Sequence, residues 1–210
     1  MTILAFEFSS ARRSVALARD GIVLSEAAET GGYRVTNAFG LTEKVLANAK
    51  VSREEVEVIA VGIGPGSYTG IRAAIAIAQG WQLAREIKLL GISCAEVLAV
   101  QAQAEKLYGS VNVIIDAQRG EFYLATWEIS VDERKEISPL KIEPAVEIEA
   151  LKLAGEICVG PEMERILFPS AAMLARLAAA RTNFVAGEKL EPIYLRETTF
   201  VKASPLLRSS

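Results

Sequence analysis

The strongest chemical signature in this sequence is a glycine-rich loop at residues 62–72, which reads Gly-Ile-Gly-Pro-Gly-Ser-Tyr-Thr-Gly-Ile-Arg. It lies between an apolar, buried-type segment, 56–63, and a helical pattern, 69–86. The N-terminus of a helix offers free backbone amides to an anion, and glycine lets the backbone approach a ligand closely. The loop therefore predicts either phosphate or carboxylate binding, or a tight strand-to-helix connection in which Ser67 or Thr69 caps the helix.

Two common nucleotide-binding motifs do not fit this loop. A P-loop ends in Gly-Lys-Ser or Gly-Lys-Thr, and no lysine follows a glycine at that spacing. A dinucleotide fingerprint that began at Gly64 and Gly66 would need glycine or alanine at position 69, which is a threonine. The loop's candidate anion-binding residues are Gly64, Gly66, Ser67, Thr69 and Arg72.

A second candidate is the turn after the first predicted strand, residues 6–13, which reads Phe-Glu-Phe-Ser-Ser-Ala-Arg-Arg. Glu7 could align a metal ion, although a lone carboxylate at a strand end is more often structural. Ser9 and Ser10 complete the candidate anion or nucleotide cleft on this side. The turn contains no glycine, so its side chains would crowd a phosphate, and this argues against kinase chemistry.

A third candidate is a predicted hairpin at residues 116–123, which reads Asp-Ala-Gln-Arg-Gly-Glu-Phe-Tyr. Gly120 supplies the positive φ that a tight hairpin needs, and the flanking charges then face water or pair with each other. If an anion enters between the two halves of the chain, Arg119 and Arg72 are the natural pair to meet it, with Asp116 nearby.

The chain contains no histidine, which excludes several kinds of active site at once. Ser-His-Asp and Cys-His nucleophile systems, histidine metal sites and histidine general bases all need that residue. Cys94 and Cys158 lie far apart in apolar stretches and are expected to be buried, reduced thiols. No catalytic residue and no metal ligand is therefore predicted.

The net charge of −3 shows no excess of lysine and arginine. A protein that grips a nucleic-acid backbone unaided normally carries such an excess. Any link to RNA is therefore expected to run through partners. No segment reaches the roughly 18 unbroken apolar residues of a membrane helix, so we expect a cytoplasmic protein without membrane contact.

The elements that must position these candidates repeat along the chain. In the first half the hydrophobic pattern predicts strands at 2–8, 14–19 and 22–28, a helix at 37–50, a strand at 56–63, a helix at 69–86, a strand at 88–91 and a helix at 94–106. From Val111 it predicts strands at 111–115, 121–129 and 136–144, a helix at 147–153, a strand at 157–159 and a helix at 170–181 with Ser170 as N-cap.

A three-stranded meander followed by crossover helices, present twice, predicts an α/β, actin-like fold (ASKHA, RNase H-like) with duplicated βββαβαβα order. Two lobes then face each other across a cleft. The expected bounds are 1–108 for the first lobe, 109–188 for a second, reduced lobe and 189–210 for a segment that returns to the first lobe.

Several motifs together resemble the TsaB (YeaZ) family of the Gcp-like, glycoprotease M22 superfamily. They are the acidic-Phe-Ser-Ser turn and the segments 64–72, 91–93, 116–123 and 192–196. The resemblance spans almost the whole chain. The Gly-Pro-Gly-Ser-aromatic-Thr-Gly-hydrophobic-Arg string followed by the Asp-Ala-x-Arg-Gly-Glu hairpin is highly specific.

The resemblance implies a non-catalytic partner that binds and activates TsaD, the homologue that threonylcarbamoylates tRNA adenosine next to the anticodon (t6A biosynthesis). The ATPase TsaE would belong to the same assembly, and tRNA would be reached indirectly through the complex. No cofactor is expected on this chain alone, whereas ATP or ADP in the complex and a homodimer both stay open. The resemblance also implies a partner interface on the first-lobe helices, which we assign to Leu41, Val45, Ile75 and Ala78.

The alternative is an enzyme that acts alone, either an actin-fold phosphotransferase or a metallopeptidase. A phosphotransferase would need a glycine-rich first turn with a well-placed acid. A metallopeptidase would need metal ligands. Here the first turn reads Glu7-Phe8-Ser9 where the family usually has Asp-Thr-Ser, and Asn37 stands near where relatives often carry a histidine.

Overall fold

Two five-stranded mixed sheets organise the chain in the computed structural model, which describes residues 1–31 and 37–195. The strands of the first sheet are β1 (Thr2–Glu7), β2 (Arg12–Arg19), β3 (Ile22–Thr30), β4 (Val58–Gly62) and β5 (Lys88–Ile92). Those of the second are β6 (Gly109–Gln118), β7 (Glu121–Ile129), β8 (Arg134–Pro144), β9 (Ile157–Gly160) and β10 (Arg165–Ile166).

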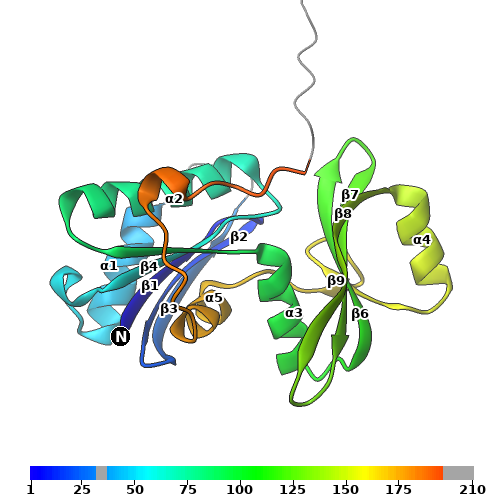
Figure 1. The fold of residues 1–210 in the computed structure, drawn as a ribbon, viewed down its shortest axis with the longest axis horizontal. Helices are drawn as coiled ribbons and strands as arrows, with labels where there is room; N and C mark the ends of the chain where they lie inside the picture. The colour runs from blue at the N-terminus through cyan, green and yellow to red at the C-terminus, as the bar shows by residue number, and fades with distance from the viewer. Residues whose placement is uncertain (32–36, 196–210) are drawn as a thin grey trace, which may run out of the picture.

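The two sheets have the same strand order. It is β3-β2-β1-β4-β5 in the first and, read from the other edge, β8-β7-β6-β9-β10 in the second. In each sheet a three-stranded antiparallel meander is extended by parallel strands beside its first strand. This repeat confirms the predicted duplication and the two-lobed, actin-like α/β fold (Figure 1).

Helices cover both faces of the first sheet, which is why all six residues of β1 are buried. Helices α1 (Ala38–Ala49) and α2 (Tyr68–Ala84) pack on the face that carries Leu4 and Phe6. Helix α5 (Ala171–Ala179) packs on the opposite face, beside Ile3 and Ala5. The alternation of side chains along a strand divides β1 between two hydrophobic clusters.

The second sheet is covered by helices from both halves of the sequence. Helix α3 (Cys94–Ala104) precedes this sheet in the chain and packs on the face with Val111 and Val113. Helix α4 (Ala145–Leu153) packs on the other face, against Ile114 and Leu124. Strand β10, which was not predicted, follows β9 without a helix between them. Helix packing therefore crosses the expected boundary at residue 108, because α3 covers the second sheet and α5 the first.

Helix α5 is tied to the first lobe at its N-terminus. Ser14 Oγ accepts a hydrogen bond from the backbone N–H of Ala171 at 2.8 Å, and Glu26 Oε1 accepts one from Ala172 at 3.2 Å. Ser170 caps the helix as predicted, with its Oγ accepting from the backbone N–H of Met173 at 3.3 Å. These bonds satisfy amides that a helix start leaves without an intrahelical partner.

Beyond α5 the chain crosses back over the first lobe as a segment that we call the C-terminal strap, residues 184–195. Its short 3₁₀ helix, Gly187–Lys189, is held by α2, because Gln79 Nε2 donates to the Gly187 carbonyl at 2.8 Å and the Gly187 N–H donates to Gln82 Oε1 at 2.7 Å. Farther along, the Ile193 N–H donates to the Ile63 carbonyl at 2.9 Å. The rest of the predicted return segment, 196–210, lies outside the described residues. None of the helices described, from α1 to α5, combines the length and the apolar character needed to cross a membrane.

Candidate functional site

The glycine-rich loop packs against the first turn of the chain. A Cβ atom built on Gly66 would lie 2.2 Å from the Ser9 carbonyl oxygen, and one on Gly70 would lie 1.9 Å from the Phe8 carbonyl oxygen. The Ser67 N–H donates to the Ser9 carbonyl at 2.6 Å. Two of the glycines therefore let the loop backbone approach the first turn, and the space next to them is filled by the protein itself.

The loop also ends in an ordinary helix cap. Ser67 Oγ accepts a hydrogen bond from the Gly70 N–H at 3.4 Å, which identifies Ser67 as the N-cap of α2. Thr69, the alternative cap, is exposed. The structure thus favours the tight strand-to-helix connection as the role of this loop.

Glu7 is buried without a cation beside it. Its side chain has no solvent exposure, and none of the ion pairs among residues 1–31 and 37–195 includes it. Oε1 accepts from the Ser9 N–H at 2.8 Å, and Oε2 lies 3.2 Å from the Cys94 thiol. Burial raises the pKa of this carboxyl, and the hydrogen bonds from Ser9 and Cys94 offset only part of that shift.

The cysteine beside Glu7 belongs to the same buried cluster. The Gly64 N–H donates to Cys94 Sγ at 3.2 Å. Burial first, and then the nearby Glu7, raise the pKa of the Cys94 thiol well above its usual range. A thiol with a raised pKa is a poor nucleophile, which agrees with the expected inert role. Cys158 is buried as well, and neither cysteine forms a disulfide.

Ser9 and Ser10 face inward. Both are buried, and Ser10 Oγ donates to the Arg12 carbonyl at 2.8 Å. In the part of the chain that the structure describes, no three cysteine, aspartate or glutamate side chains lie close enough together to hold a metal ion. The first-lobe half of the candidate cleft is therefore a set of internal contacts that fix the first turn.

The hairpin residues form a separate group on the second lobe. Asp116 accepts hydrogen bonds from the Gln118 backbone N–H at 2.7 Å and from Gln118 Nε2 at 2.5 Å. Arg119 is exposed at the turn, where Gly120 has the predicted positive φ of 75°. Arg72 lies in α2 of the first lobe, so the two arginines come from different lobes. Their joint role in meeting an anion stays a prediction.

Arg72 has different neighbours, both aromatic. Its Nη1 donates to the Tyr68 hydroxyl at 2.7 Å, and its guanidinium lies 5.2 Å from the centre of the Tyr68 ring. Tyr194, on the C-terminal strap, places its ring 6.1 Å from that of Tyr68. The hydrogen bond to Tyr68 raises the pKa of Arg72 most, and Tyr194 adds to the effect. The sequence-based prediction included Arg72 but missed both tyrosines.

The four predicted interface residues lie inside the first lobe. The exposed fractions of their side chains are at most 8%, because they form the inner faces of α1 and α2 against the sheet; they are Leu41, Val45, Ile75 and Ala78. The prediction that these four side chains form a partner surface is therefore wrong, because the core already buries them. An interface on these helices has to use the outer faces instead.

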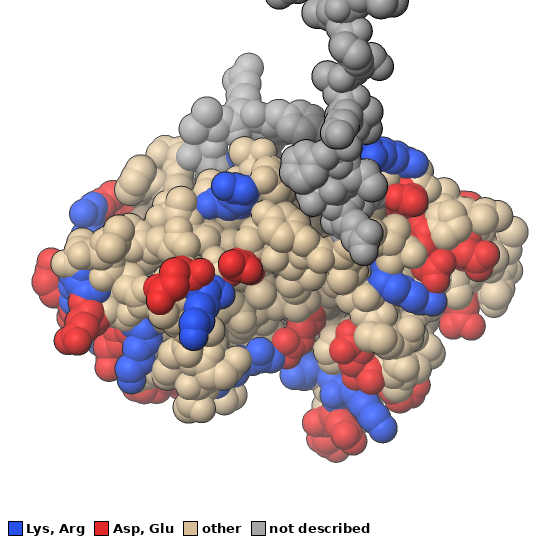
Figure 2. Space-filling view, turned by 45° about the horizontal axis from the view of Figure 1, so that its top comes forward, with Lys and Arg blue, Asp and Glu red and all other residues tan. Residues whose placement is uncertain are grey.

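The outer faces of α1 and α2 carry exposed apolar side chains, together with the charged Glu43 and Lys44 of α1. We define the α1–α2 outer face by Phe39, Ala73, Ala76, Ile77, Gly80 and Trp81. Phe39 is 73% exposed. In Figure 2 the visible upper surface of the first lobe is mostly tan, with one blue side chain within it and further charged side chains toward its edges.

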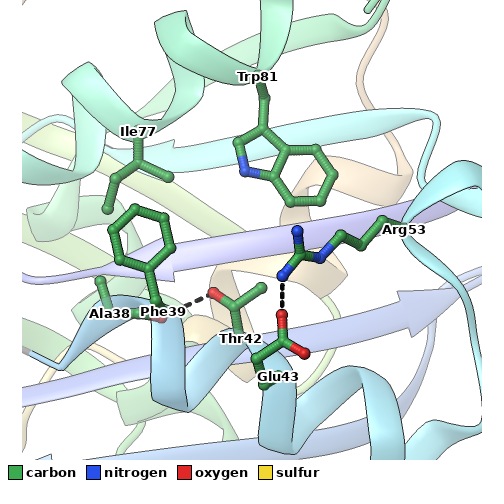
Figure 3. Close-up of a pocket in the computed structure, with 7 residues that line it drawn as sticks. All are labelled: Ala38, Phe39, Thr42, Glu43, Arg53, Ile77 and Trp81. Carbon is green, nitrogen blue, oxygen red and sulfur yellow. Dashed lines mark hydrogen bonds and ion pairs between the residues drawn. The ribbon is translucent and has the colours of Figure 1, made fainter. Parts of the chain in front are cut away.

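A small depression lies between the two helices on this face. Phe39 and Ile77 line one side and Trp81 another, while the ion pair between Glu43 and Arg53 closes one end (Figure 3). Its volume is about 40 Å³, far below the roughly 300 Å³ of a typical small-molecule site. It has room for part of one side chain of a partner and no room for a nucleotide.

Comparisons with known proteins place this chain among tRNA-modification proteins. Residues 12–194 match the family model described as "TsaD: tRNA N6-adenosine threonylcarbamoyltransferase". The chain is 30% identical to the Escherichia coli K12 "tRNA threonylcarbamoyladenosine biosynthesis protein TsaB", over 98% of this chain and 99% of that protein. It is 29% identical to the Bacillus subtilis protein of the same name, over 61% of this chain and 56% of that protein.

Solved structures agree with the sequence relatives. The structure described as "YeaZ from Pseudomonas aeruginosa" superposes with a TM-score of 0.79 at 25% identity, covering 92% of this chain and all of that chain. A second Pseudomonas aeruginosa structure, described as similar to peptidase YEAZ, gives a TM-score of 0.80 at 26% identity. The similarity extends through both lobes.

Proposed function

Since the chain belongs to the TsaB family of tRNA threonylcarbamoyladenosine biosynthesis proteins, we propose that it is the non-catalytic partner that binds and activates TsaD, the threonylcarbamoyltransferase. The observation that carries the proposal is the match to a TsaB protein over nearly the full length of both chains. We propose a cytoplasmic location, because the proposed role is in tRNA modification. TsaE completes the proposed assembly, which would reach tRNA mainly through TsaD.

The arrangement of the candidate cleft supports a non-catalytic role. Glu7 is buried, and Ser9 and Ser10 form hydrogen bonds with other residues of the first turn. The backbone of the first turn occupies the space beside Gly66 and Gly70. The groups that would position phosphate or metal in an actin-like enzyme are thus engaged within the first lobe.

The proposed contact with TsaD is the α1–α2 outer face. The family resemblance points to the first-lobe helices, and their inner faces are occupied by the core. What they leave for a partner is a largely apolar surface with one small depression, which is bounded by Phe39 and Trp81 and closed at one end by the Glu43–Arg53 ion pair. A partner with a complementary apolar surface would bury these side chains, and aromatic residues that become fully buried contribute strongly to such interfaces.

Direct binding measurement tests this contact. The double substitution Phe39→Asp with Ala76→Glu puts two charges on the outer face, and we expect it to weaken the affinity for TsaD at least about tenfold. Leu153→Asp is the matched control, because Leu153 is 89% exposed on α4 of the second lobe. The proposed interface is wrong if the double variant binds TsaD like the unsubstituted chain, or if the Leu153 variant loses binding equally.

A further inference from the structure

Three exposed side chains meet where the end of the C-terminal strap reaches the start of α2. Tyr68 is 57% exposed and Tyr194 is 56% exposed, and Arg72 is exposed between solvent and the Tyr68 ring. We call these three residues the Tyr-Arg cluster. Two aromatic rings that are more than half exposed, and that come from segments 126 positions apart, form one continuous surface.

No described carboxylate, within residues 1–31 and 37–195, neutralises the cation in this cluster. Arg72 donates from Nη1 to the Tyr68 hydroxyl, and its guanidinium also interacts with Tyr194. A guanidinium has five N–H donors, so most of them face solvent. Arg72 is held by an aromatic ring while it keeps the capacity to bind an anion.

Aromatic faces beside an unneutralised guanidinium fit a nucleotide strand. A base stacks on an exposed ring whatever its sequence, and the guanidinium pairs with the adjacent phosphodiester. From this geometry we propose that the Tyr-Arg cluster binds a single-stranded RNA segment directly, with a base on Tyr68 or Tyr194 and a phosphate on Arg72. The choice of RNA over DNA rests on the proposed role in tRNA modification.

The surroundings of the cluster favour a strand over a free di- or triphosphate. A polyphosphate is normally held by several converging backbone amides, and the nearby Ser67 and Gly70 amides are already bonded to Ser9 and Ser67. One guanidinium matches the single charge of one phosphodiester. The rings are exposed on the surface, as in stacking platforms for single strands.

The position of the cluster suits a substrate that lies across both lobes. Tyr194 is carried by the end of the C-terminal strap, which is fixed to the first lobe by the bond between Ile193 and Ile63. In Figure 1 the described end of the strap and the β6–β7 turn both lie along the upper edge of the molecule. Arg119 belongs to that turn, because it lies between the end of β6 and the start of β7. A strand bound at the Tyr-Arg cluster could thus extend toward a second exposed arginine.

A titration of the isolated, full-length chain tests the proposal independently of TsaD. Backbone amide chemical shifts are followed by NMR while a ten-nucleotide single-stranded oligouridylate is added, and ADP is titrated separately. We expect shifts centred on the Tyr-Arg cluster, and an affinity at least about fivefold higher for the oligonucleotide than for ADP. Because one phosphate is contacted, the logarithm of the binding constant should fall with the logarithm of salt concentration with a slope of about −0.7.

Substitutions separate the cluster from other surface residues. Tyr194→Leu and Arg72→Gln should each weaken oligonucleotide binding at least about fivefold, whereas Tyr108→Leu, at a 40% exposed tyrosine outside the cluster, should not. Unfolding temperatures confirm that each variant is folded. Shifts elsewhere only, equal binding by the cluster variants, or ADP binding as tight as the oligonucleotide would each overturn the proposal. If the cluster variants lose TsaD and keep the oligonucleotide, the cluster is a protein contact and the RNA assignment is wrong.

Discussion

The thiol of Cys94, the first residue of α3, lies 3.2 Å from Oε2 of Glu7, the last residue of β1, and neither side chain is exposed to solvent. The contact joins the end of the first strand to the helix that leads into the second lobe. Gly62 makes room for it, since a Cβ on that residue would lie 2.0 Å from Oε2. A carboxylate that the sequence offered as a possible metal ligand is here part of the core.

Replacing Glu7 should change how stability depends on pH. The folded-state pKa of Glu7 is raised above its ordinary 4.5, so the carboxyl favours folding fully only below that pH, and this contribution is lost as pH rises through the folded pKa. Glutamine resembles the protonated acid and does not ionise. We therefore expect the stability of Glu7→Gln, relative to the unsubstituted protein, to increase from pH 4.5 upward, measured by urea unfolding.

The control for this experiment is Glu191→Gln, at an exposed position on the C-terminal strap. Its stability relative to the unsubstituted protein should stay flat over the same pH range. A Glu7→Gln difference that is equally flat, or that shrinks as pH rises, would show that the buried carboxyl does not carry a raised pKa.

Two glycines of α2 should respond to alanine in opposite directions. At Gly70 the new Cβ would meet the Phe8 carbonyl at 1.9 Å, whereas at Gly80 it would meet nothing within 4 Å. Gly70→Ala should lower the free energy of unfolding by about 1 to 3 kcal/mol or more, because neither backbone can yield easily. Gly80→Ala should raise it by about 0.5 to 1 kcal/mol, as expected within a helix. Equal effects in chemical denaturation would contradict the close packing of loop and first turn.

The bond from Ser14 to α5 should be measurable as a stability contribution. Ser14→Ala leaves the buried N–H of Ala171 without an acceptor, and we expect a loss of about 1 to 3 kcal/mol. Ser25→Ala is the control, since the Ser25 hydroxyl takes part in none of the hydrogen bonds found among the described residues. If both variants unfold at the same denaturant concentration, Ser14 does not anchor α5.

The two faces of α1 should tolerate charge very differently. Val45 is fully buried and Phe39 is 73% exposed on the same helix. Val45→Asp buries a charge without a partner and should cost about 4 kcal/mol or more, enough to unfold a marginal domain. Phe39→Asp should change stability by no more than about 0.5 kcal/mol. A folded, stable Val45→Asp protein would contradict the burial of Val45 and would support its predicted place in the partner interface.

The sequence predicted the order of the elements along the chain but not which face of each first-lobe helix points away from the sheet. Period-two and period-four patterns located β1 and α1 to within one residue, because local hydrophobic spacing determines them. The same spacing cannot tell which apolar stripe of α2 faces the sheet when both stripes are apolar. Ile75 was therefore assigned to the partner interface, whereas the structure buries it in the core and leaves Ile77 partly buried beside the depression on the outer side.

Contacts between distant segments were beyond sequence reasoning. Tyr194 meets Tyr68 only because the strap crosses α2, and Cys94 meets Glu7 only because β5 lies beside β4. A tyrosine four residues before Arg72 on a helix was a usable signal, since such pairs are neighbours on one face. The two-residue β10 gave no periodic signal at all.

Reconstitution of the modification reaction tests the central claim most directly. Unmodified tRNA is incubated with TsaD, TsaE and a source of threonylcarbamoyl-adenylate, with and without this chain, and modified adenosine is measured over time. We predict at least about tenfold faster modification when the chain is present, and none when the chain replaces TsaD. Equal modification without the chain, or modification by the chain in the absence of TsaD, would contradict its role as a non-catalytic activator.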